Sequence, residues 1–222
     1  MTAPTKCGFV ALVGAPNAGK STLLNALVGT KVSIVTHKAQ TTRAQVRGVV
    51  TIEETQLVFI DTPGIFAPKR RLDRAMVQSA WTGAGDADMV ALIVDAKKGL
   101  APDVEALLEG LENIRQPKVL VINKIDTVRR ETLLKLSEAL NEKGRFEATF
   151  MISALKGDGV ADFTNWCIAN APMGEWHFPE EHLTDLTLAL TAAEVTREKL
   201  FLRIHDEIPY NATVETESFK VQ

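Results

Sequence analysis

One short segment near the N-terminus does most to limit the folds available to this chain. Residues 14–21 read Gly-Ala-Pro-Asn-Ala-Gly-Lys-Ser, a complete match to the pattern Gly-x-x-x-x-Gly-Lys-Ser. The apolar run Gly8 to Val13 precedes this segment, and Lys20 to Val28, with leucines at helical spacing, follows it. A strand, a glycine-rich turn and a helix in this order predict one unit of a parallel sheet with crossover helices.

The same segment has the composition of a phosphate-binding loop. Glycine and alanine carry little side-chain bulk, so backbone N–H groups can surround phosphate oxygens while the next helix points its N-terminus at them. Lys20 is expected to reach the terminal phosphates, and Ser21 to offer a hydroxyl to Mg²⁺. A glycine-rich turn without a ligand is the less favoured interpretation, because the segment stands between a strand and a helix.

Short apolar runs and amphipathic segments alternate through residues 7–171, which is typical of buried strands and crossover helices. The further runs are Leu57 to Ile60, Met89 to Val94, Val119 to Ile122 and Thr149 to Ile152. Helical spacing runs from Val104 to Ile114 after Pro102, and from Leu133 to Leu140. Val49 to Glu53 is more polar and is interpreted as an edge strand, joined by a hairpin to the Leu57 run. These patterns predict an α/β fold with three layers and a mostly parallel, six-stranded sheet.

A second chemical segment, Asp61-Thr62-Pro63-Gly64, follows the Leu57 run. An acid at the carboxyl end of a strand next to the phosphate loop is suited to support Mg²⁺ indirectly. Gly64 would let a backbone N–H approach the γ-phosphate. Alone, this segment is more often a plain turn, but the phosphate loop upstream favours the functional interpretation.

Asn123-Lys124-Ile125-Asp126 follows the Val119 run and predicts which base is bound. Guanine presents two adjacent N–H donors, and the Asp126 carboxylate can accept both, whereas adenine has an acceptor there. Lys124 can lay its stem over the base, and Asn123 can tie the loops together. Ser153-Ala154-Leu155 ends the next run, so the Ala154 N–H is expected to meet the carbonyl oxygen of the base.

These segments, in this order, resemble the translation-factor-related GTPases, and the form Gly-x-Pro-Asn-x-Gly-Lys-Ser is similar to that of their Era, EngA and MnmE-like branch. Residues 38–43, Lys-Ala-Gln-Thr-Thr-Arg, resemble the Era family, as do residues 177–180, 184–185, 193–194 and 197–200. This sequence departs from the pattern of the Era family at Leu186 to Leu190, which is more apolar than expected there. The resemblance implies a P-loop NTPase fold and slow hydrolysis of GTP to GDP and phosphate.

The resemblance also assigns roles to single residues. It implies that Thr42, or else Thr41, closes onto Mg²⁺ when GTP is bound, and that Asn17 is linked to activation by K⁺. The residues expected to act in catalysis are Lys20, Thr42 and Gly64, with Mg²⁺ held by Ser21 and Thr42 and indirectly by Asp61. The residues expected to bind nucleotide are Gly14, Ala15, Pro16, Asn17, Ala18, Gly19, Lys20, Ser21, Thr22, Asp61, Gly64, Asn123, Lys124, Asp126, Ser153, Ala154 and Leu155.

The residue after Gly64 is Ile65, where a glutamine could position the attacking water. An apolar side chain cannot orient a nucleophile, so we expect slow intrinsic turnover. The resemblance implies the same, because this branch has a hydrophobic residue there and relies on K⁺ near Asn17.

Composition excludes several other classes. The 222 residues carry 25 Lys+Arg against 28 Asp+Glu, a net charge of −3 that gives no bulk attraction to polyanions. Cys7 and Cys167 lie far apart without metal-ligand spacing, so we expect buried thiols in a reducing cytosol. No apolar stretch approaches the roughly 20 residues that a membrane span needs. We therefore expect a cytoplasmic protein. A monomer is a separate expectation.

The C-terminal part has a different pattern. Residues 1–171 are predicted to be a GTPase domain and residues 172–187, broken by prolines, a linker. Beyond them, Ala193, Leu200, Ile204 and Ile208 predict one face of a helix that Pro209 ends, and residues 213–221 a strand. The resemblance implies that 188–222 are the N-terminal fragment of a KH RNA-binding domain without its Gly-x-x-Gly loop. We expect this fragment to pack poorly, to extend into solvent or to need a partner chain.

The partners implied by the resemblance are GTP and GDP and, for a full-length protein, 16S rRNA and the 30S ribosomal subunit during small-subunit assembly. Residues 180–222 carry 4 Lys+Arg against 9 Asp+Glu and are not expected to bind rRNA well by themselves. Peripheral association with the inner face of the cell membrane is also implied.

The basic cluster Lys69, Arg70, Arg71 and Arg74 is either a solvated helix face, which is favoured, or a contact to RNA phosphates. The alternative function is that of a related membrane-remodelling or tRNA-modifying GTPase.

Overall fold

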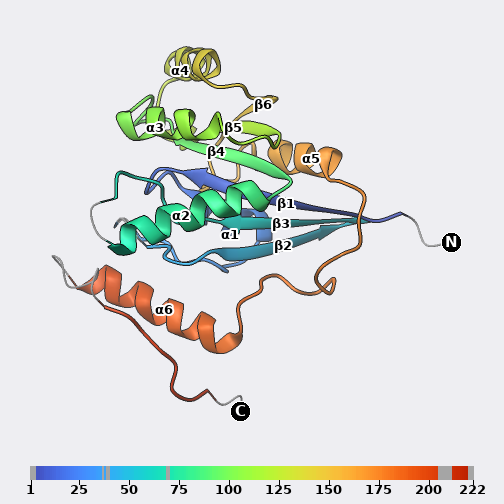
Figure 1. The fold of residues 1–222 in the computed structure, drawn as a ribbon, viewed down its shortest axis with the longest axis vertical. Coiled ribbons are helices and arrows are strands. Elements are labelled where there is room, and N and C mark those ends of the chain that lie inside the picture. Colours follow the sequence, from blue (N-terminus) through green and yellow to red (C-terminus); the bar gives the residue numbers. More distant parts are fainter. Residues whose placement is uncertain (1–3, 37, 39–40, 69–70, 205–211, 220–222) are drawn as a thin grey trace.

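The computed structural model describes residues 4–36, 38, 41–68, 71–204 and 212–219, and a six-stranded sheet lies at its centre (Figure 1). The strand order is β2-β3-β1-β4-β5-β6, and only the β2–β3 pair is antiparallel. The strands are β1 (Lys6–Gly14), β2 (Val46–Ile52), β3 (Thr55–Asp61), β4 (Met89–Asp95), β5 (Lys118–Asn123) and β6 (Ala148–Ile152). The predicted mostly parallel sheet is therefore confirmed.

Helices cover both faces of the sheet, because successive side chains of a strand point to opposite sides. Leu12 of β1 packs in one core cluster with α1 (Lys20–Val28) and α5 (Val160–Asn170). Val13, the next residue, packs in the other cluster. That second cluster includes side chains from α2 (Arg71–Asp86), α3 (Pro102–Leu111) and α4 (Arg130–Lys143). Every residue of β3 and β4 is buried, which explains why these strands read as continuous apolar runs.

The predicted hairpin between β2 and β3 is present. Ile52 pairs with Thr55, and Glu53 adopts the left-handed backbone that such a tight turn requires (φ 51°). β2 begins at Val46, earlier than the run of residues 49–53 indicated, because Val46, Arg47 and Gly48 continue the antiparallel pairing with β3 without forming an apolar run. Helix α2 was predicted only at its start, where the favoured interpretation of the basic cluster was a solvated helix face; Arg71 and Arg74 are exposed on α2.

Residues 172–187, which have no helix or strand of their own, run from the start of β1, where the Cys7 N–H donates to the Pro172 carbonyl oxygen, to the edge strand β2. The Val49 N–H donates to the Leu183 carbonyl oxygen at 2.9 Å, and Arg47 forms an ion pair of 3.0 Å with Asp185. At the other end of this segment, the Gln56 side chain accepts the His177 N–H at 3.0 Å. An open sheet edge carries unpaired N–H and C=O groups, and this segment satisfies part of that edge.

The C-terminal predictions need correction. Helix α6 spans Leu188–Arg203, with Thr187 as its N-cap, and Ile204 is already extended (φ −95°, ψ 138°) rather than helical. Ile208 and Pro209, expected to end the helix, lie outside the described residues. The strand predicted at 213–221 is wrong for the described residues 212–219, which form none. A strand needs a neighbouring strand to satisfy its hydrogen bonds, and the described tail supplies no partner.

Of the three expectations for the tail, poor packing does not hold for α6, although residues 213 and 215–219 beyond it are exposed. Phe201 of α6 is fully buried, and Figure 1 shows α6 lying along one side of the sheet domain. Within the described part of the chain, no helix is long and apolar enough to cross a bilayer.

Truncating the central aromatic cluster should destabilise the fold. Phe163 is fully buried, with its ring centroid 5.6 Å from Phe150 and 6.1 Å from Phe59. We expect Phe163→Ala to lower the free energy of unfolding by about 3–5 kcal/mol in urea titrations. Phe219→Ala, at a side chain 47% exposed, is the matched control and should cost less than about 0.5 kcal/mol. Equal losses in the two variants would contradict this packing.

Candidate functional site

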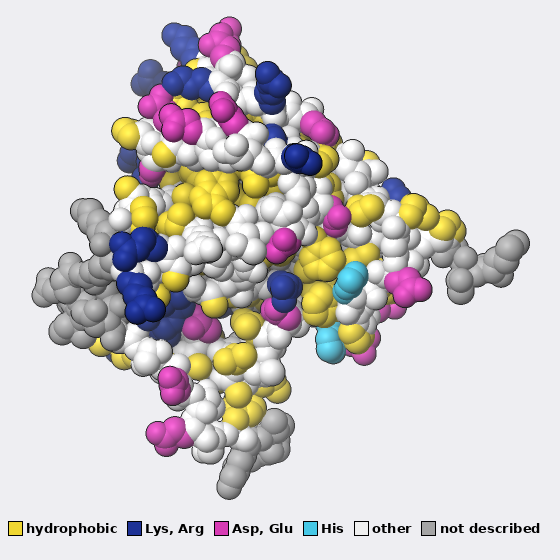
Figure 2. All heavy atoms as spheres, viewed as in Figure 1, with side chains coloured by type: hydrophobic (Ala, Val, Ile, Leu, Met, Phe, Trp, Pro, Cys, Tyr) yellow, Lys and Arg dark blue, Asp and Glu magenta, His cyan; other side chains and the backbone are white. Residues whose placement is uncertain are grey.

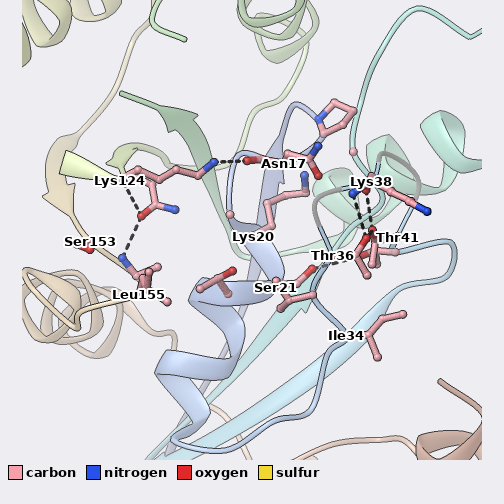
Figure 3. Close-up of a pocket in the computed structure, with 18 of the residues that line it drawn as sticks. Asn17, Lys20, Ser21, Ile34, Thr36, Lys38, Thr41, Lys124, Ser153 and Leu155 are labelled. Atoms are coloured by element: carbon pink, nitrogen blue, oxygen red, sulfur yellow. Dashed lines mark hydrogen bonds between the residues drawn. The ribbon is translucent and has the colours of Figure 1, made fainter. Parts of the chain in front are cut away.

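The carboxyl ends of β1, β3, β5 and β6 meet at one edge of the sheet, and a cavity of about 380 Å³ opens there (Figure 3). Ligands of open α/β sheets bind at this edge, where loops leave neighbouring strands. Its lining combines the predicted phosphate loop, the predicted base-binding loops and the segment between α1 and β2. The predicted residues in the lining are Pro16, Asn17, Gly19, Lys20, Ser21, Thr22, Thr42, Gly64, Asn123, Lys124, Asp126, Ser153, Ala154 and Leu155. Gly14, Ala15, Ala18 and Asp61 are buried beside the cavity and do not line it.

Backbone geometry explains two residue choices in the phosphate loop. Asn17 and Gly19 both have left-handed backbones, with φ of 62° and 101°. A Cβ at Gly19 would also collide with the Asn123 side chain, so only glycine fits where α1 begins.

Lys20 is buried and turned back onto its own loop. Its Nζ donates to the carbonyl oxygens of Gly14 at 2.9 Å and Ala15 at 3.0 Å. Burial lowers the pKa of Lys20 to about 8, against the opposing effect of the Asp61 carboxylate, while Lys98 lowers it further. A phosphate in the cavity would replace the two carbonyl oxygens as partner of this ammonium group.

Two predicted magnesium residues, Ser21 and Thr42, converge on the carboxylate of the third, Asp61. Asp61 Oδ2 accepts hydrogen bonds from Ser21 at 2.6 Å, Ser33 at 2.9 Å and Thr42 at 3.4 Å. The hydroxyls of Ser21 and Thr42 are 3.1 Å apart. Asp61 is fully buried, and burial raises its pKa, although Lys20 and the three hydroxyls oppose that rise. Its second oxygen, Oδ1, is buried without a hydrogen-bond partner.

This oxygen set fits a magnesium ion. Mg²⁺ prefers hard oxygen ligands and keeps several waters, so two hydroxyls with a carboxylate behind them suit it. The orphaned Asp61 Oδ1 also marks a place where a polar group, such as a water of the ion, would relieve an unsatisfied acceptor.

The two threonines of the Thr41–Thr42 pair have different partners. Thr41 lies 2.6 Å from the Thr36 hydroxyl and donates to the Lys38 carbonyl oxygen at 2.7 Å, within its own loop (Figure 3). Thr42 instead contacts Ser21 and Asp61. The geometry therefore favours Thr42 over Thr41 for the ion.

The segment after Asp61 packs tightly against the phosphate loop. A Cβ at Gly64 would lie 2.8 Å from the Pro16 Cα, so a glycine is required at this close approach. Ile65 is buried in the core, and its N–H donates to the Gly14 carbonyl oxygen at 3.1 Å. The Ile65 side chain is thus unable to orient a water in the cavity.

Asn123 connects the two ends of the cavity. Its Nδ2 donates to the Ala18 carbonyl oxygen at 3.0 Å, and its Oδ1 accepts the N–H groups of Lys124 and Ala154 at 2.8 and 3.0 Å. Asn123 therefore ties the loops together, as predicted. The Ala154 N–H, expected to face the base, is engaged by Asn123, so a base oxygen would have to share this donor.

The predicted base-reading residues are held by neighbouring side chains. Asp126 accepts the Ser153 hydroxyl at 2.9 Å, and this hydrogen bond is the main cause of the lowered pKa of Asp126. The Lys124 Nζ bridges the Asn17 carbonyl oxygen at 2.6 Å and the Asp95 carboxylate at 2.7 Å. Its stem therefore crosses the cavity from the base end to the phosphate loop (Figure 3).

Sequence reasoning missed two contributors, Asp95 and Ser33. Asp95 ends β4 at the same edge as Asp61 and Asn123, so the rule that identified those residues applies to it as well. Ser33 lies in an irregular segment, where the Asn25 side chain holds the Ser33 backbone. No sequence motif indicates that Ser33 belongs to the site.

Comparisons with known proteins agree with this geometry. A family model described as 50S ribosome-binding GTPase matches residues 9–124. GTPase Era from Sinorhizobium medicae is 58% identical over 217 residues, covering 98% of this chain and 70% of that protein. The chain belongs to the Era family of GTPases.

Solved structures of Era extend the likeness to three dimensions. A crystal structure of Era in complex with MgGDPNP and nucleotides 1506–1542 of 16S ribosomal RNA is 41% identical, with a TM-score of 0.87. The alignment covers 93% of this chain and 70% of that one. A variant of Aquifex aeolicus Era bound to GDP and AlF₄⁻ is also 41% identical, with a TM-score of 0.86 over 92% of this chain and 70% of that one. The chain is thus a GTPase of the Era type.

The lowered pKa of Lys20 predicts a pH dependence of nucleotide affinity. A phosphate next to Lys20 favours its charged form, so binding above pH 8 must take up a proton. We expect the affinity for Mg²⁺–GDP to fall as the pH rises through 8, with a slope that approaches about tenfold per pH unit above it. Calorimetry in two buffers of different ionisation enthalpy measures the proton uptake. A pH-independent affinity without uptake would be inconsistent with this role of Lys20.

Proposed function

We propose that the chain binds GTP in this cavity and works as a Mg²⁺-dependent switch. The observation that carries the proposal is the convergence of Ser21, Thr42 and Asp61 at the phosphate end of the cavity. The hydroxyls of Ser21 and Thr42 are 3.1 Å apart, and both donate to Asp61. The segment containing Thr42 follows α1, and its contact with Ser21 closes it over the phosphate loop. Such a segment is ordered by γ-phosphate and Mg²⁺ and released after hydrolysis in GTPases.

The residues of the phosphate end act by position and charge. Lys20 would neutralise the terminal phosphates. Ser21 and Thr42 would hold Mg²⁺, which would supply further positive charge to stabilise the phosphate oxygens. The N–H groups of the loop and of Gly64 donate to phosphate oxygens. Hydrolysis is slow, because the buried Ile65 leaves the attacking water without a positioning side chain.

K⁺ is part of the proposal as an activator beside Asn17. Asn17 lines the cavity on the phosphate loop, and its amide oxygen is a ligand of the kind that hard cations bind. An additional positive charge at this place would stabilise the charge that develops on the transferred phosphoryl group.

We expect K⁺ in place of Na⁺, at equal ionic strength, to raise the rate of phosphate release several-fold. In Asn17→Ala the two salts should give equal rates, whereas Asn141→Ala, at an exposed site on α4, should keep the difference. Equal rates in the two salts for the unmodified chain would remove the role of Asn17.

Guanine selection is assigned to Asp126. Its lowered pKa keeps the carboxylate ionised, so it can accept the two N–H donors of guanine. Ser153 fixes the orientation of the carboxylate through a hydrogen bond of 2.9 Å.

Exchanging this acceptor should change the preferred base. Asp126→Asn presents a donor to the base, so we expect xanthosine nucleotides to bind more tightly than guanosine nucleotides, the reverse of the unmodified chain. Competition titrations with GDP and xanthosine diphosphate measure this preference, and Asp158→Asn, an exposed acid near Ser153, is the control. An unchanged preference in Asp126→Asn would refute the assignment.

The proposed partner of the full-length protein is small-subunit rRNA on the 30S subunit. The related Era whose structure contains nucleotides 1506–1542 of 16S rRNA supports this partner. Residues 188–222 are proposed to be the first part of a KH domain after a GTPase domain, 1–171, and a linker, 172–187. The element boundaries support this division, since α5 ends at Asn170 and α6 begins at Leu188.

The basic cluster remains a second candidate for RNA contact. Arg71 and Arg74 are exposed on α2, and Figure 2 shows Lys and Arg side chains gathered at that end of the molecule. Lys69 and Arg70 lie outside the described residues. Peripheral membrane association and a monomeric state stay predictions, and the membrane-remodelling alternative is not favoured by the Era relatives.

A further inference from the structure

The tail helix α6 is held by hydrogen bonds and an ion pair to the segment between α1 and β2, which contains Thr42. The Glu198 carboxylate of α6 accepts the Val35 N–H at 3.0 Å through one oxygen and the Lys31 ammonium at 2.5 Å through the other. Its side chain is only 4% exposed. Burial alone would raise the pKa of Glu198, but the hydrogen bonds from Lys31 and Val35 outweigh burial and lower it. A buried, ionised carboxylate therefore has its partners in the segment between α1 and β2.

A second set of contacts involves Arg43, which follows Thr42, and Lys38, which precedes it. The Arg43 guanidinium stacks over the Phe201 ring at 5.5 Å, and its Nη1 donates to the Ala212 carbonyl oxygen at 2.8 Å. The Lys38 ammonium donates to the Ile204 carbonyl oxygen. Thr42 is thus bracketed by residues that the tail holds on both sides.

The bracketed segment has no helix or strand of its own among its described residues 30–36, 38 and 41–45. Its conformation therefore depends on what it packs against. Ile34 and Val35 line the nucleotide cavity, and Val35 is the residue whose N–H Glu198 holds. A displacement of Val35 would thus change the wall of the cavity and the approach of Thr42 to Ser21.

We propose that Glu198 is a positioning residue for the nucleotide site. Its contacts hold the described residues 31–36 and 41–42 closed over the phosphate end, so that GTP is favoured over GDP. This inference rests on the proposed role of Thr42 at Mg²⁺. A contact made only in the closed conformation strengthens binding of the ligand that requires closure, by the free energy that couples the two. GTP requires closure through its γ-phosphate and Mg²⁺, and GDP does not.

The test compares Mg²⁺ complexes of fluorescent GDP and fluorescent GDPNP on the full chain. Glu198→Ala should weaken GDPNP binding about tenfold, within the range typical of coupled sites, and change GDP binding less than about twofold. Glu198→Gln should weaken GDPNP binding by less, because its amide oxygen still accepts the Val35 N–H while the charge facing Lys31 is lost. Glu138→Gln, an exposed acid on α4, is the control and should leave both affinities unchanged.

A second arm tests whether Glu198 acts through Thr42. The single variant Thr42→Ala is compared with the double variant Thr42→Ala, Glu198→Ala. The double variant should bind GDPNP less than about twofold more weakly than the single one, because the Thr42 hydroxyl that Glu198 helps to position is already absent. Additive losses in the double variant would overturn the proposal.

Two outcomes of the first arm would also overturn it. Equal losses of GDP and GDPNP affinity in Glu198→Ala would mean general damage to the fold, and no loss of either would mean that the contact is irrelevant to the site. If the unmodified chain bound neither nucleotide, the proposed GTP site itself would fail, together with this role of Glu198. Retained GDP binding separates that failure from a failure of Glu198 alone.

Discussion

A single buried carboxylate organises the phosphate end of the site. Asp61 ends β3, a strand buried along its whole length, so the position of its carboxylate is fixed by the sheet rather than by a loop. Three hydroxyls, from Ser21, Ser33 and Thr42, donate to one of its oxygens. These side chains belong to α1 and to the irregular segment after it, which are thereby drawn to the same point. The remaining oxygen is buried and unpaired, which favours a polar ligand at this place.

The base end of the cavity shares this rigid frame through Asn123. The Asn123 amide joins the phosphate loop at Ala18 to the loop after β6 at Ala154. The loops that would bind the phosphates and the base of a nucleotide are therefore held together by hydrogen bonds. The salt bridge between Lys124 and Asp95 adds a third connection across the same edge of the sheet. Preorganised groups of this kind bind a ligand without the free-energy cost of ordering them at the moment of binding.

The features that short sequence motifs determine could be predicted without the structure. The phosphate loop, the buried strands and Asn123 each combine a short motif with a place at the carboxyl end of a strand, and the structure brings them together as expected. The irregular segment after α1 was predicted only in part. The choice between Thr41 and Thr42, and the part played by Ser33, depend on long-range packing that no spacing encodes.

The tail was the least predictable part for the same physical reason. Its helix was extended to Ile208 from the spacing of Ala193, Leu200, Ile204 and Ile208, yet α6 ends at Arg203. The buried face of α6 includes Phe201, which that spacing did not single out and which stacks with Arg43. The contact of Glu198 with Lys31 and Val35 joins residues more than 160 positions apart in the chain. Such contacts follow from tertiary structure, which overrides local propensity.

The convergence of hydroxyls on Asp61 is most directly tested by a crystal structure of this chain with Mg²⁺ and GDPNP. Ser21 Oγ and Thr42 Oγ1 are both expected to bind the ion at about 2.1 Å, with Asp61 holding a water of its coordination shell. Lys20 should have left the carbonyl oxygens of Gly14 and Ala15 for the phosphates. A magnesium ion bound without Thr42, or bound away from Ser21 and Asp61, would contradict the site described for this chain.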